Sequence, residues 1–553
     1  MSVSAGSKKK SAPRKRTPSK PEAAAEAPTT LRLDYQLAEL PTAQHRAGLA
    51  GLVLMLRHSL ERLPGRERGT ARVTRLDEVG ASVEFDLDGL RRLFDELYAA
   101  SMEERAESKP REGQPPLREE ERETKDEKGK SRLKRYFIYE VPVPRAGLLL
   151  DLDPTSNGRS GHWVKLWRDM LWQTLRGVPA TRAPFEHRAA GKPVDDAEET
   201  WKVLARPESS VPLSSTDYLG AMERTADNVP FADRARFQFL LHFWPYVTQV
   251  YVPQRLVVKE GRSKGEPQGY ALAIPDVAVL DAFCEELPPM LRNRGVEVLG
   301  FRPKEALVDL AVESALNTGR RLRERLARSE GAKPTRDLVL GFEVFHLDKE
   351  GNNVRLYSVS RIEPEPSMLD EYEALRPMLW DPLFRRTRLL NLVQHRPWYA
   401  GFDRIAATVP YAATFGAPYF RHDARESFQR NEAMSQSETS AAPVPAIESL
   451  VLQLVRGYVS RKVRNRTGLE WDSSKDNEPR KKEYAEAKER IARDAFLAVR
   501  SRTGQDFVEY FASTLCSVPH HLKPEQFVLL SRALHERTAD VRTLTLLALS
   551  AVG

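Results

Sequence analysis

The pattern of apolar and polar positions predicts a mixture of strands and helices over the first 430 residues. Residues 31–35, LRLDY, alternate as a half-buried strand does, and the apolar text of residues 40–63 predicts a helix directly after it. Within residues 161–176, Trp163 and Trp167 recur at helical spacing, which predicts an amphipathic helix whose aromatic side chains belong to the core. A further apolar, helix-like block covers residues 231–250.

Two strand pairs are predicted in the second part of this region. Residues 255–261 and 269–277 have strand-like apolar text and are joined by a charged, glycine-rich tip, GRSKGEPQG, at residues 261–269. Residues 337–348 and 354–362 form the second pair, because the Lys-Glu-Gly-Asn-Asn between them has the chemistry of a hairpin turn.

Three stretches lack the apolar residues that a core needs. Residues 1–30 form a basic tail in which lysine and arginine stand among Ser, Pro and Ala, and residues 103–135 are nearly all charge, Gly and Pro. We expect both stretches to be disordered, the second as an insertion inside a domain. Residues 431–445 have the Ser/Ala/Pro composition of a linker.

Beyond this linker almost every segment has a helical pattern. Apolar residues from Val451 to Val463 recur at helical spacing and make one continuous stripe. We therefore predict an α+β fold, in which a mixed N-terminal body of β-hairpins and helices is followed by a C-terminal helical bundle. The body is expected at residues 31–430 and the bundle at residues 446–553.

The opening helix has the marks of close packing. Ala43, Ala47 and Gly51 are spaced four apart, which makes a groove of small residues where another backbone can lie close. Thr42 is placed to be its N-cap. We expect His45 and Arg46, in the first turn, to face a partner subunit or an RNA and not to be catalytic.

The charge balance permits a polyanionic partner. The 553 residues include 86 Lys and Arg against 78 Asp and Glu, a formal net charge of +8. The two cysteines, Cys284 and Cys516, are far apart, which argues against a disulfide framework or a cysteine zinc site and favours a cytoplasmic protein. The longest apolar run, residues 47–56, is too short for a membrane span, and the basic N-terminus lacks the apolar segment of a signal peptide.

No catalytic signature is found. The sequence lacks the phosphate-binding Gly-x-x-x-x-Gly-Lys-Ser/Thr loop, His-Glu-x-x-His and Gly-x-Ser-x-Gly. Residues 151–158 place Gly158 too late for a calcium loop, so a turn is expected there. The His422-Asp423 pair lacks the further ligands that a two-metal site needs. We therefore expect no catalytic residue, no metal and no cofactor.

The charged hairpin tip is the first candidate surface for nucleic acid. Its polar residues suit phosphate oxygens and base edges, and they are Lys259, Arg262, Lys264 and Gln268. The alternative interpretation is a solvated hairpin tip without a ligand.

The second candidate surface lies in the predicted bundle. Arg456, Arg461 and Arg464 face away from the apolar stripe of their helix, so they are placed to meet a phosphate backbone. A charged helix face that is only solvated is the alternative.

Several phrases, taken in order, resemble one known family. They are LDYQLAELPTAQHRAGLAGL, WVKLWRDMLWQTLRGVPATRAPFE, SSTDYLGAMERTADNVPF, LLHFWPYVTQVYVP, GYALAIPDV and NLVQHRPWYAGF. Together they cover residues 31–402 and resemble the large subunit of type I CRISPR effector complexes (Cascade), specifically the MYXAN-subtype large-subunit family. The charged stretch at 103–135 and the basic tail lie outside this resemblance.

The resemblance implies a nonenzymatic role in a surveillance complex guided by crRNA. Large subunits of this kind lie beside the crRNA handle, read the protospacer-adjacent motif (PAM) on duplex DNA and help to open it into an R-loop. They recruit a separate effector, either a helicase-nuclease or a transposition module. The expected partners are therefore the crRNA, target double-stranded DNA, the other Cascade backbone subunits and that effector, while base pairing reads the target sequence.

The sequence leaves two alternatives standing. Met434 lies in the predicted linker, so an internal start there would give a separate C-terminal product, but an ordinary linker methionine explains it equally well. The alternative function is a basic protein-interaction or regulatory scaffold without specific nucleic-acid reading. An RNA-processing nuclease is disfavoured because its site is missing.

Overall fold

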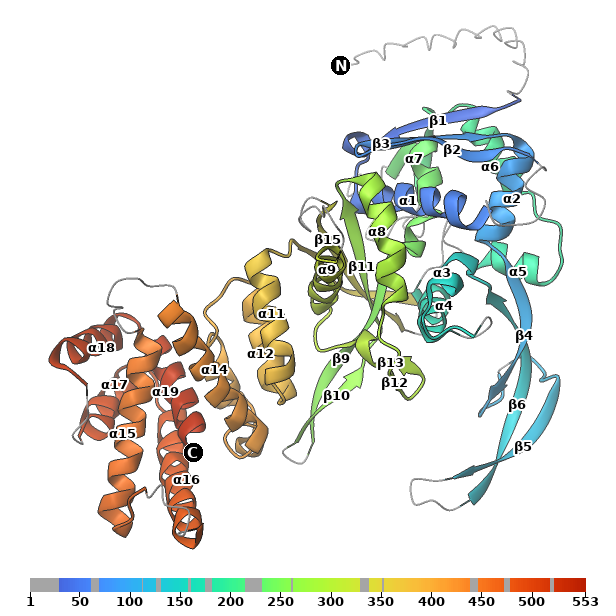
Figure 1. Ribbon diagram of the computed structural model, residues 1–553. Coiled ribbons are helices and arrows are strands. Elements are labelled where there is room, and N and C mark those ends of the chain that lie inside the picture. Colours follow the sequence, from blue (N-terminus) through green and yellow to red (C-terminus); the bar gives the residue numbers. More distant parts are fainter. Residues whose placement is uncertain are drawn as a thin grey trace, which may run out of the picture.

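The computed structural model in Figure 1 describes most of the chain. The described residues are 29–60, 69–111, 113–125, 131–157, 161–174, 182–213, 231–259, 262–328, 338–350, 353–437, 446–471, 478–517 and 522–553. The predicted basic tail at residues 1–30 lies outside them except for its last two residues.

A three-stranded antiparallel sheet begins the fold. It contains β1 (Leu31–Gln36), β2 (Ala71–Leu76) and β3 (Gly80–Phe85) in the order β1-β3-β2. The inward residues of β1 alternate with exposed ones, which confirms the predicted strand. Helix α1 (Ala43–Leu54) follows as predicted, and nearly all of its residues are buried.

Two glycines let α1 pack against a neighbouring backbone. A Cβ atom added at Gly48 would stand 2.3 Å from the carbonyl oxygen of Leu240, and one added at Gly51 would stand 2.3 Å from that of Phe243. The predicted close approach is therefore present. It runs along Gly48 and Gly51, however, and not along the Ala43, Ala47 and Gly51 row.

The first turn of α1 does not face a partner, contrary to the prediction. His45 is only 2% exposed, and its Nε2 lies 2.9 Å from a carboxylate oxygen of Asp233. The Arg46 guanidinium donates to Asp276 at 2.7 Å. Both side chains therefore tie α1 to later parts of its own fold. Thr42 is the N-cap residue, but its hydroxyl bonds the His45 ring and not the helix backbone.

Short helices and strands make up the rest of the N-terminal region. They are α2 (Leu87–Leu97), α3 (Gly147–Leu152), α4 (His162–Thr174), α5 (Ala183–Ala189), α6 (Asp196–Leu204), β7 (Ser210–Leu213), β8 (Phe231–Arg234) and α7 (Ala235–Leu240). Trp163 and Trp167 of α4 are buried, which confirms the predicted core helix. The block at 231–250 is not one helix, since β8, α7 and a 3-10 turn at Trp244–Tyr246 divide it.

A six-stranded sheet forms the centre of the body. Its main path is β10 (Arg262–Pro267), β9 (Gln249–Lys259), β11 (Tyr270–Val277), β15 (Val339–Glu350) and β16 (Asn353–Ile362), and β14 (Leu307–Val308) pairs with β9. The second predicted strand pair is present as β15 and β16. The strands of the first pair are present, but residues 255–259 pair with β10, and β11 pairs with residues 249–251 of β9. The charged stretch predicted as a hairpin tip is itself strand β10, because its residues alternate across a ladder with β9.

Further elements complete this region. They are α8 (Leu280–Arg292), β12 (Val298–Leu299), β13 (Arg302–Pro303) and α9 (Glu313–Leu326). Helix α8 packs on α1 and α9, so the central sheet and the N-terminal helices share one hydrophobic core.

The charged stretch at 103–135 is a folded arm, and the prediction of disorder is wrong where the structure describes it. Strands β4 (Ala100–Glu107), β6 (Ser131–Pro144) and β5 (Arg118–Lys125) form an antiparallel sheet that projects from the body (Figure 1). Arg118 on β5 donates to both carboxylate oxygens of Glu104 on β4. Strand β6 lies between these two strands, so Arg118 and Glu104 reach each other across it, and the charges that suggested disorder form ion pairs on the sheet.

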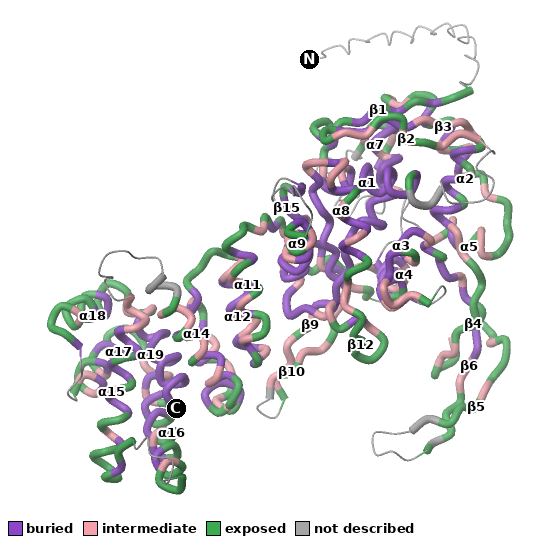
Figure 2. Tube along the Cα trace, viewed as in Figure 1, coloured by how far each residue is buried: buried purple, intermediate pink, exposed green. Residues whose placement is uncertain are grey.

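The C-terminal part is helical. Its helices are α11 (Pro366–Met378), α12 (Pro382–Val393), α13 (Phe402–Thr408), α14 (Pro418–Ser437), α15 (Ile447–Thr467), α16 (Glu478–Arg500), α17 (Gly504–Tyr510), α18 (Pro524–Glu536) and α19 (Thr538–Val552). Helix α19 is buried along most of its length at the centre of these helices (Figure 2). The predicted helical bundle is therefore present.

The second core begins well before the predicted linker. It includes Leu375 of α11 and three residues of α14, Phe420, Ala424 and Phe428, which are spaced four apart and so share one helix face. Residues 431–437 belong to α14, since Glu432, Ala433 and Met434 are good helix formers, and residues 438–445 lie outside the described residues. The predicted boundary between body and bundle thus does not separate the two cores.

Candidate nucleic-acid interface

Strands β9 and β10 form a two-stranded ribbon with a charged face and an apolar face. The ladder pairs Arg262 with Lys259, Lys264 with Val257, and Glu266 with Arg255. Directly opposite residues share a face of an antiparallel pair, and so do residues two apart on one strand. These three pairs therefore lie on one face of the ribbon, which we call the charged face.

The charged face holds more cations than carboxylates. The Lys259 side chain is 77% exposed and its Nζ is 3.7 Å from Glu266, while Arg255 reaches the same carboxylate at 3.5 Å. Lys264 is exposed as well. The backbone of Arg262 pairs with that of Lys259 in the ladder between β9 and β10. Sequence analysis missed Arg255, although its two-residue alternation with Val257 and Lys259 was a signal for it.

The opposite face of the ribbon is braced by the C-terminal helices. Leu256 packs against the second core, and the Arg386 guanidinium of α12 donates to the carbonyl oxygen of Gln254 at 2.9 Å. Gln268 lies at the base of the ribbon, where its backbone N–H donates to Pro253 and its carbonyl oxygen meets His346. The structure thus brings Lys259 and Lys264 together on one face and leaves Gln268 apart from them.

Helix α15 presents the second predicted surface. Its apolar stripe is buried in the second core, whereas Arg456, Arg461 and Arg464 are exposed on the other side, as predicted. The three arginines line a groove of about 720 Å³. Arg464 donates to Glu470 at 2.6 Å, and both of these side chains remain more than half exposed.

Sequence analysis missed two features beside these arginines. Trp471, which follows α15, lines the same groove and is 62% exposed. On α16, Lys488 is close enough to Arg425 and Arg456 for their charges to act on it. Burial first, and then these two positive charges, lower the pKa of Lys488. Cations from α14, α15 and α16 therefore gather at one place, which no sequence spacing reveals.

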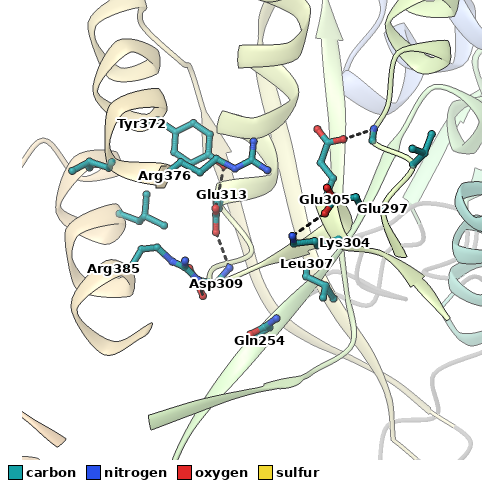
Figure 3. Close-up of a pocket in the computed structure, with 14 residues that line it drawn as sticks. Gln254, Glu297, Lys304, Glu305, Leu307, Asp309, Glu313, Tyr372, Arg376 and Arg385 are labelled. Atoms are coloured by element: carbon teal, nitrogen blue, oxygen red, sulfur yellow. Dashed lines mark hydrogen bonds and ion pairs between the residues drawn. The ribbon is translucent and has the colours of Figure 1, made fainter. Parts of the chain in front are cut away.

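A polar pocket of about 650 Å³ lies where the central sheet meets α11 and α12 (Figure 3). Arg385 of α12 forms an ion pair with Asp309, and Glu313 accepts hydrogen bonds from the Asp309 backbone at 2.7 Å and the Tyr372 hydroxyl at 3.0 Å. Burial, and next the charge of Asp309, raise the pKa of Glu313. The ion pair of Arg385 with Asp309 thus links helix α12 to the body that contains the central sheet.

The 151–158 loop and the His422-Asp423 pair have structural roles. Asp153 accepts hydrogen bonds from Thr155 and from the backbone of Val164, so it holds the turn before α4. Asp423 accepts the backbone N–H groups of Trp380 and Asp381. Within the described ranges, no three His, Cys, Asp or Glu side chains are grouped as metal ligands would be. None of the described helices is long and apolar enough to cross a bilayer.

Two family models match the chain in order. The type I-B CRISPR Cas8b N-terminal domain matches residues 70–332, and the type I-B CRISPR Cas8b C-terminal domain matches residues 339–552. No curated protein matches it. The resemblance to the large subunit of type I complexes, inferred from the sequence, is thereby confirmed, and the matching models are those of type I-B. The chain belongs to the Cas8b family, the large subunits of type I-B CRISPR effector complexes.

Proposed function

We propose that this chain engages target DNA as the nonenzymatic large subunit of a type I-B surveillance complex. The observation that carries the proposal is that a Cas8b chain presents two exposed cationic surfaces, the charged face of the β9–β10 ribbon and the α15 groove. Its partners are the crRNA handle, target duplex DNA and the Cascade backbone subunits. It also recruits a separate effector, a helicase-nuclease or a transposition module.

The ribbon is the part that reads the PAM in this proposal. The major groove of DNA admits a two-stranded β-ribbon, and lysine or arginine on such a ribbon reaches guanine edges and phosphates. Lys259 and Lys264 are exposed on the charged face, together with Arg255. Gln268, at the half-buried base of the ribbon, is the member of the predicted set least suited to reach a base edge.

Substitution of the two lysines tests this assignment. The complex is assembled with crRNA and its binding is measured against duplexes that carry every short sequence beside the target. Lys259→Ala together with Lys264→Ala is expected to flatten the preference among these flanking sequences. Lys349→Ala, an exposed lysine at the end of β15, is the control and is expected to keep the preference. An unchanged preference in the double variant rules out the ribbon as the motif reader.

The α15 groove stabilises the opened strands in this proposal. Three exposed arginines on one helix face are suited to a phosphate backbone whatever its sequence. A basic scaffold without specific reading is the alternative. It predicts that the complex assembles normally and that neither the ribbon lysines nor the α15 arginines affect DNA binding.

We also propose the separate C-terminal product that starts at Met434. Such a product would lack most of α14, which packs along α19 and whose Arg425 donates to the Ala551 carbonyl oxygen. The uncovered apolar side of α19 would then need another subunit to cover it. Mass spectrometry of the purified complex is expected to find the product, and the idea fails if no fragment begins near Met434.

A further inference from the structure

The α15 groove has one wall of helix and one of aromatic side chains. Polar and cationic residues of α15 line the first wall, and the second comes from the segment after α15 and from α16. The lining residues that matter here are Gln453, Arg456, Arg461, Arg464, Trp471 and Tyr484. The volume of about 720 Å³ is within the range of ligand clefts.

Trp471 presents an open ring to this groove. It is 62% exposed, although tryptophan has one of the largest apolar surfaces of any side chain. Tyr484, which is only 7% exposed, meets it edge-to-face with ring centroids 5.7 Å apart. One side of the indole is therefore supported from the core, while much of its surface faces solvent.

The cations run beside this ring. Arg456 and Arg464 are eight residues apart on α15, a distance of about 12 Å along the helix axis. That length matches several nucleotides of a stacked strand, whose phosphates are about 3.4 Å apart along the axis. Glu470 pairs with Arg464 in the free protein, and an exposed pair of this kind is weak enough for a phosphate to replace it.

An exposed indole beside a line of arginines favours an unpaired strand over a duplex. The faces of bases inside a duplex are covered by their neighbours, so a protein ring has no base to stack on. An unpaired strand offers a π-face at every base, and stacking on an aromatic side chain is tolerant of sequence. An apolar protein surface is a poorer fit, because it would strip water from the guanidinium groups of the groove without replacing their hydrogen bonds.

We propose that the α15 groove binds unpaired nucleotides, with a base stacked on Trp471 and the backbone phosphates on Arg456, Arg461 and Arg464. This assignment rests on the proposed function and deepens it, because it names the form of nucleic acid and the residue that selects it. Trp471 is the specificity-determining residue, and the arginines supply attraction that any phosphate chain would share.

The test compares three nucleic acids of equal length. Binding of the full-length chain is measured by anisotropy with a short oligothymidine, an abasic strand of the same length and a duplex of that length. We expect the wild-type chain to prefer oligothymidine over the abasic strand about tenfold. Trp471→Ala is expected to abolish this preference and Trp471→Phe to keep part of it. Trp380→Ala changes another exposed tryptophan, between α11 and α12, and this control is expected to leave the preference unchanged.

Each outcome separates the two proposals. If Trp471→Ala folds as shown by circular dichroism and the oligothymidine preference persists, the stacking assignment is wrong, while DNA engagement by the arginines stands. If Trp471→Ala leaves all three ligands unaffected but prevents assembly with the other subunits, the groove binds protein and the assignment is also wrong. If the wild-type chain binds none of the ligands and the assembled complex binds no DNA, the proposed function itself fails.

Discussion

Gly48 and Gly51 decide how closely α1 approaches the segment that contains Leu240 and Phe243. A methyl group at either position would overlap a backbone carbonyl oxygen, which has no rotamer by which to move away. The glycines were visible in the sequence, but their partner was not, because it lies almost two hundred residues later in the chain.

Gly48→Ala is therefore expected to lower the free energy of unfolding by about 2 kcal/mol or more. The matched change is Gly457→Ala in α15, where an added Cβ would meet nothing within 4 Å. It is expected to raise the free energy of unfolding by about 0.5–1 kcal/mol, because alanine favours the helix. Urea unfolding of both variants measures this, and equal effects would contradict the packing described for α1.

Glu313 makes a pH-dependent contribution to stability. Its folded-state pKa is raised above the ordinary 4.5, so the folded state holds the proton more tightly than the unfolded chain does. The resulting stabilisation is present below about 4.5 and is lost as the pH rises through the folded pKa.

In Glu313→Gln, the uncharged amide can still accept from the Asp309 backbone N–H through its oxygen and can donate to the Tyr372 hydroxyl through its NH2 group. Relative to the wild-type chain, this variant is expected to be more stable near pH 8 than near pH 5, by about 1 kcal/mol or more. Urea unfolding at the two pH values measures the difference. A gain of the same size at both would show that the Glu313 carboxyl does not titrate abnormally.

Lys488 is expected to make DNA binding depend on pH. Burial and the neighbouring charges of Arg425 and Arg456 lower the pKa of its ammonium, and a bound phosphate would restore it. As the pH rises, affinity for oligothymidine is therefore expected to begin to fall below pH 10.5, the ordinary pKa of lysine. Lys488→Met should weaken binding at neutral pH and make the affinity depend less on pH. Lys482→Met, which changes an exposed lysine of α16, should leave both the affinity and its pH dependence unchanged. A parallel fall in all three proteins would contradict the role of Lys488.

At the scale of elements, periodicity predicted the strands and helices that have an apolar face. The strand at residues 31–35, the helix of Trp163 and Trp167 and the stripe on α15 are all present, because each one buries a face against a core. The arm at 103–135 was not predicted, because its strands have no continuous apolar face. Its strands are held by a backbone ladder and by charge pairs across strands, such as Arg118 with Glu104, which apolar periodicity does not detect.

The exposed face of α15 is expected to contact DNA phosphates. Substitution of Arg456, Arg461 and Arg464 by glutamine is expected to weaken binding evenly across DNA sequences. It is also expected to reduce the slope of log affinity against log salt by about two units, because each phosphate contact releases a counterion. Arg532→Gln on α18, where the exposed arginine pairs with Glu536, is the control. An unchanged slope in the triple variant would show that these arginines do not contact phosphate.

At the scale of the whole molecule, two hydrophobic cores meet at a polar joint. The α+β class and the helical C-terminal part were predictable, because composition and periodicity change along the chain. The place of the joint was not. It lies at the Arg385–Asp309 pair, which joins residues more than fifty positions apart, and within α11, whose Tyr372 packs in the first core and whose Leu375 packs in the second. Helical spacing predicted the exposed arginines of the α15 groove. It did not predict that Trp471, which follows the helix, lines the same groove.

The most direct test of the central claim assembles the crRNA-guided complex with and without this chain and measures its affinity for target duplex DNA. With the chain, we expect tight binding that depends on the sequence beside the target. Without it, we expect weaker binding that ignores that sequence. Equally tight, motif-dependent binding by the complex that lacks the chain would contradict its role in engaging target DNA.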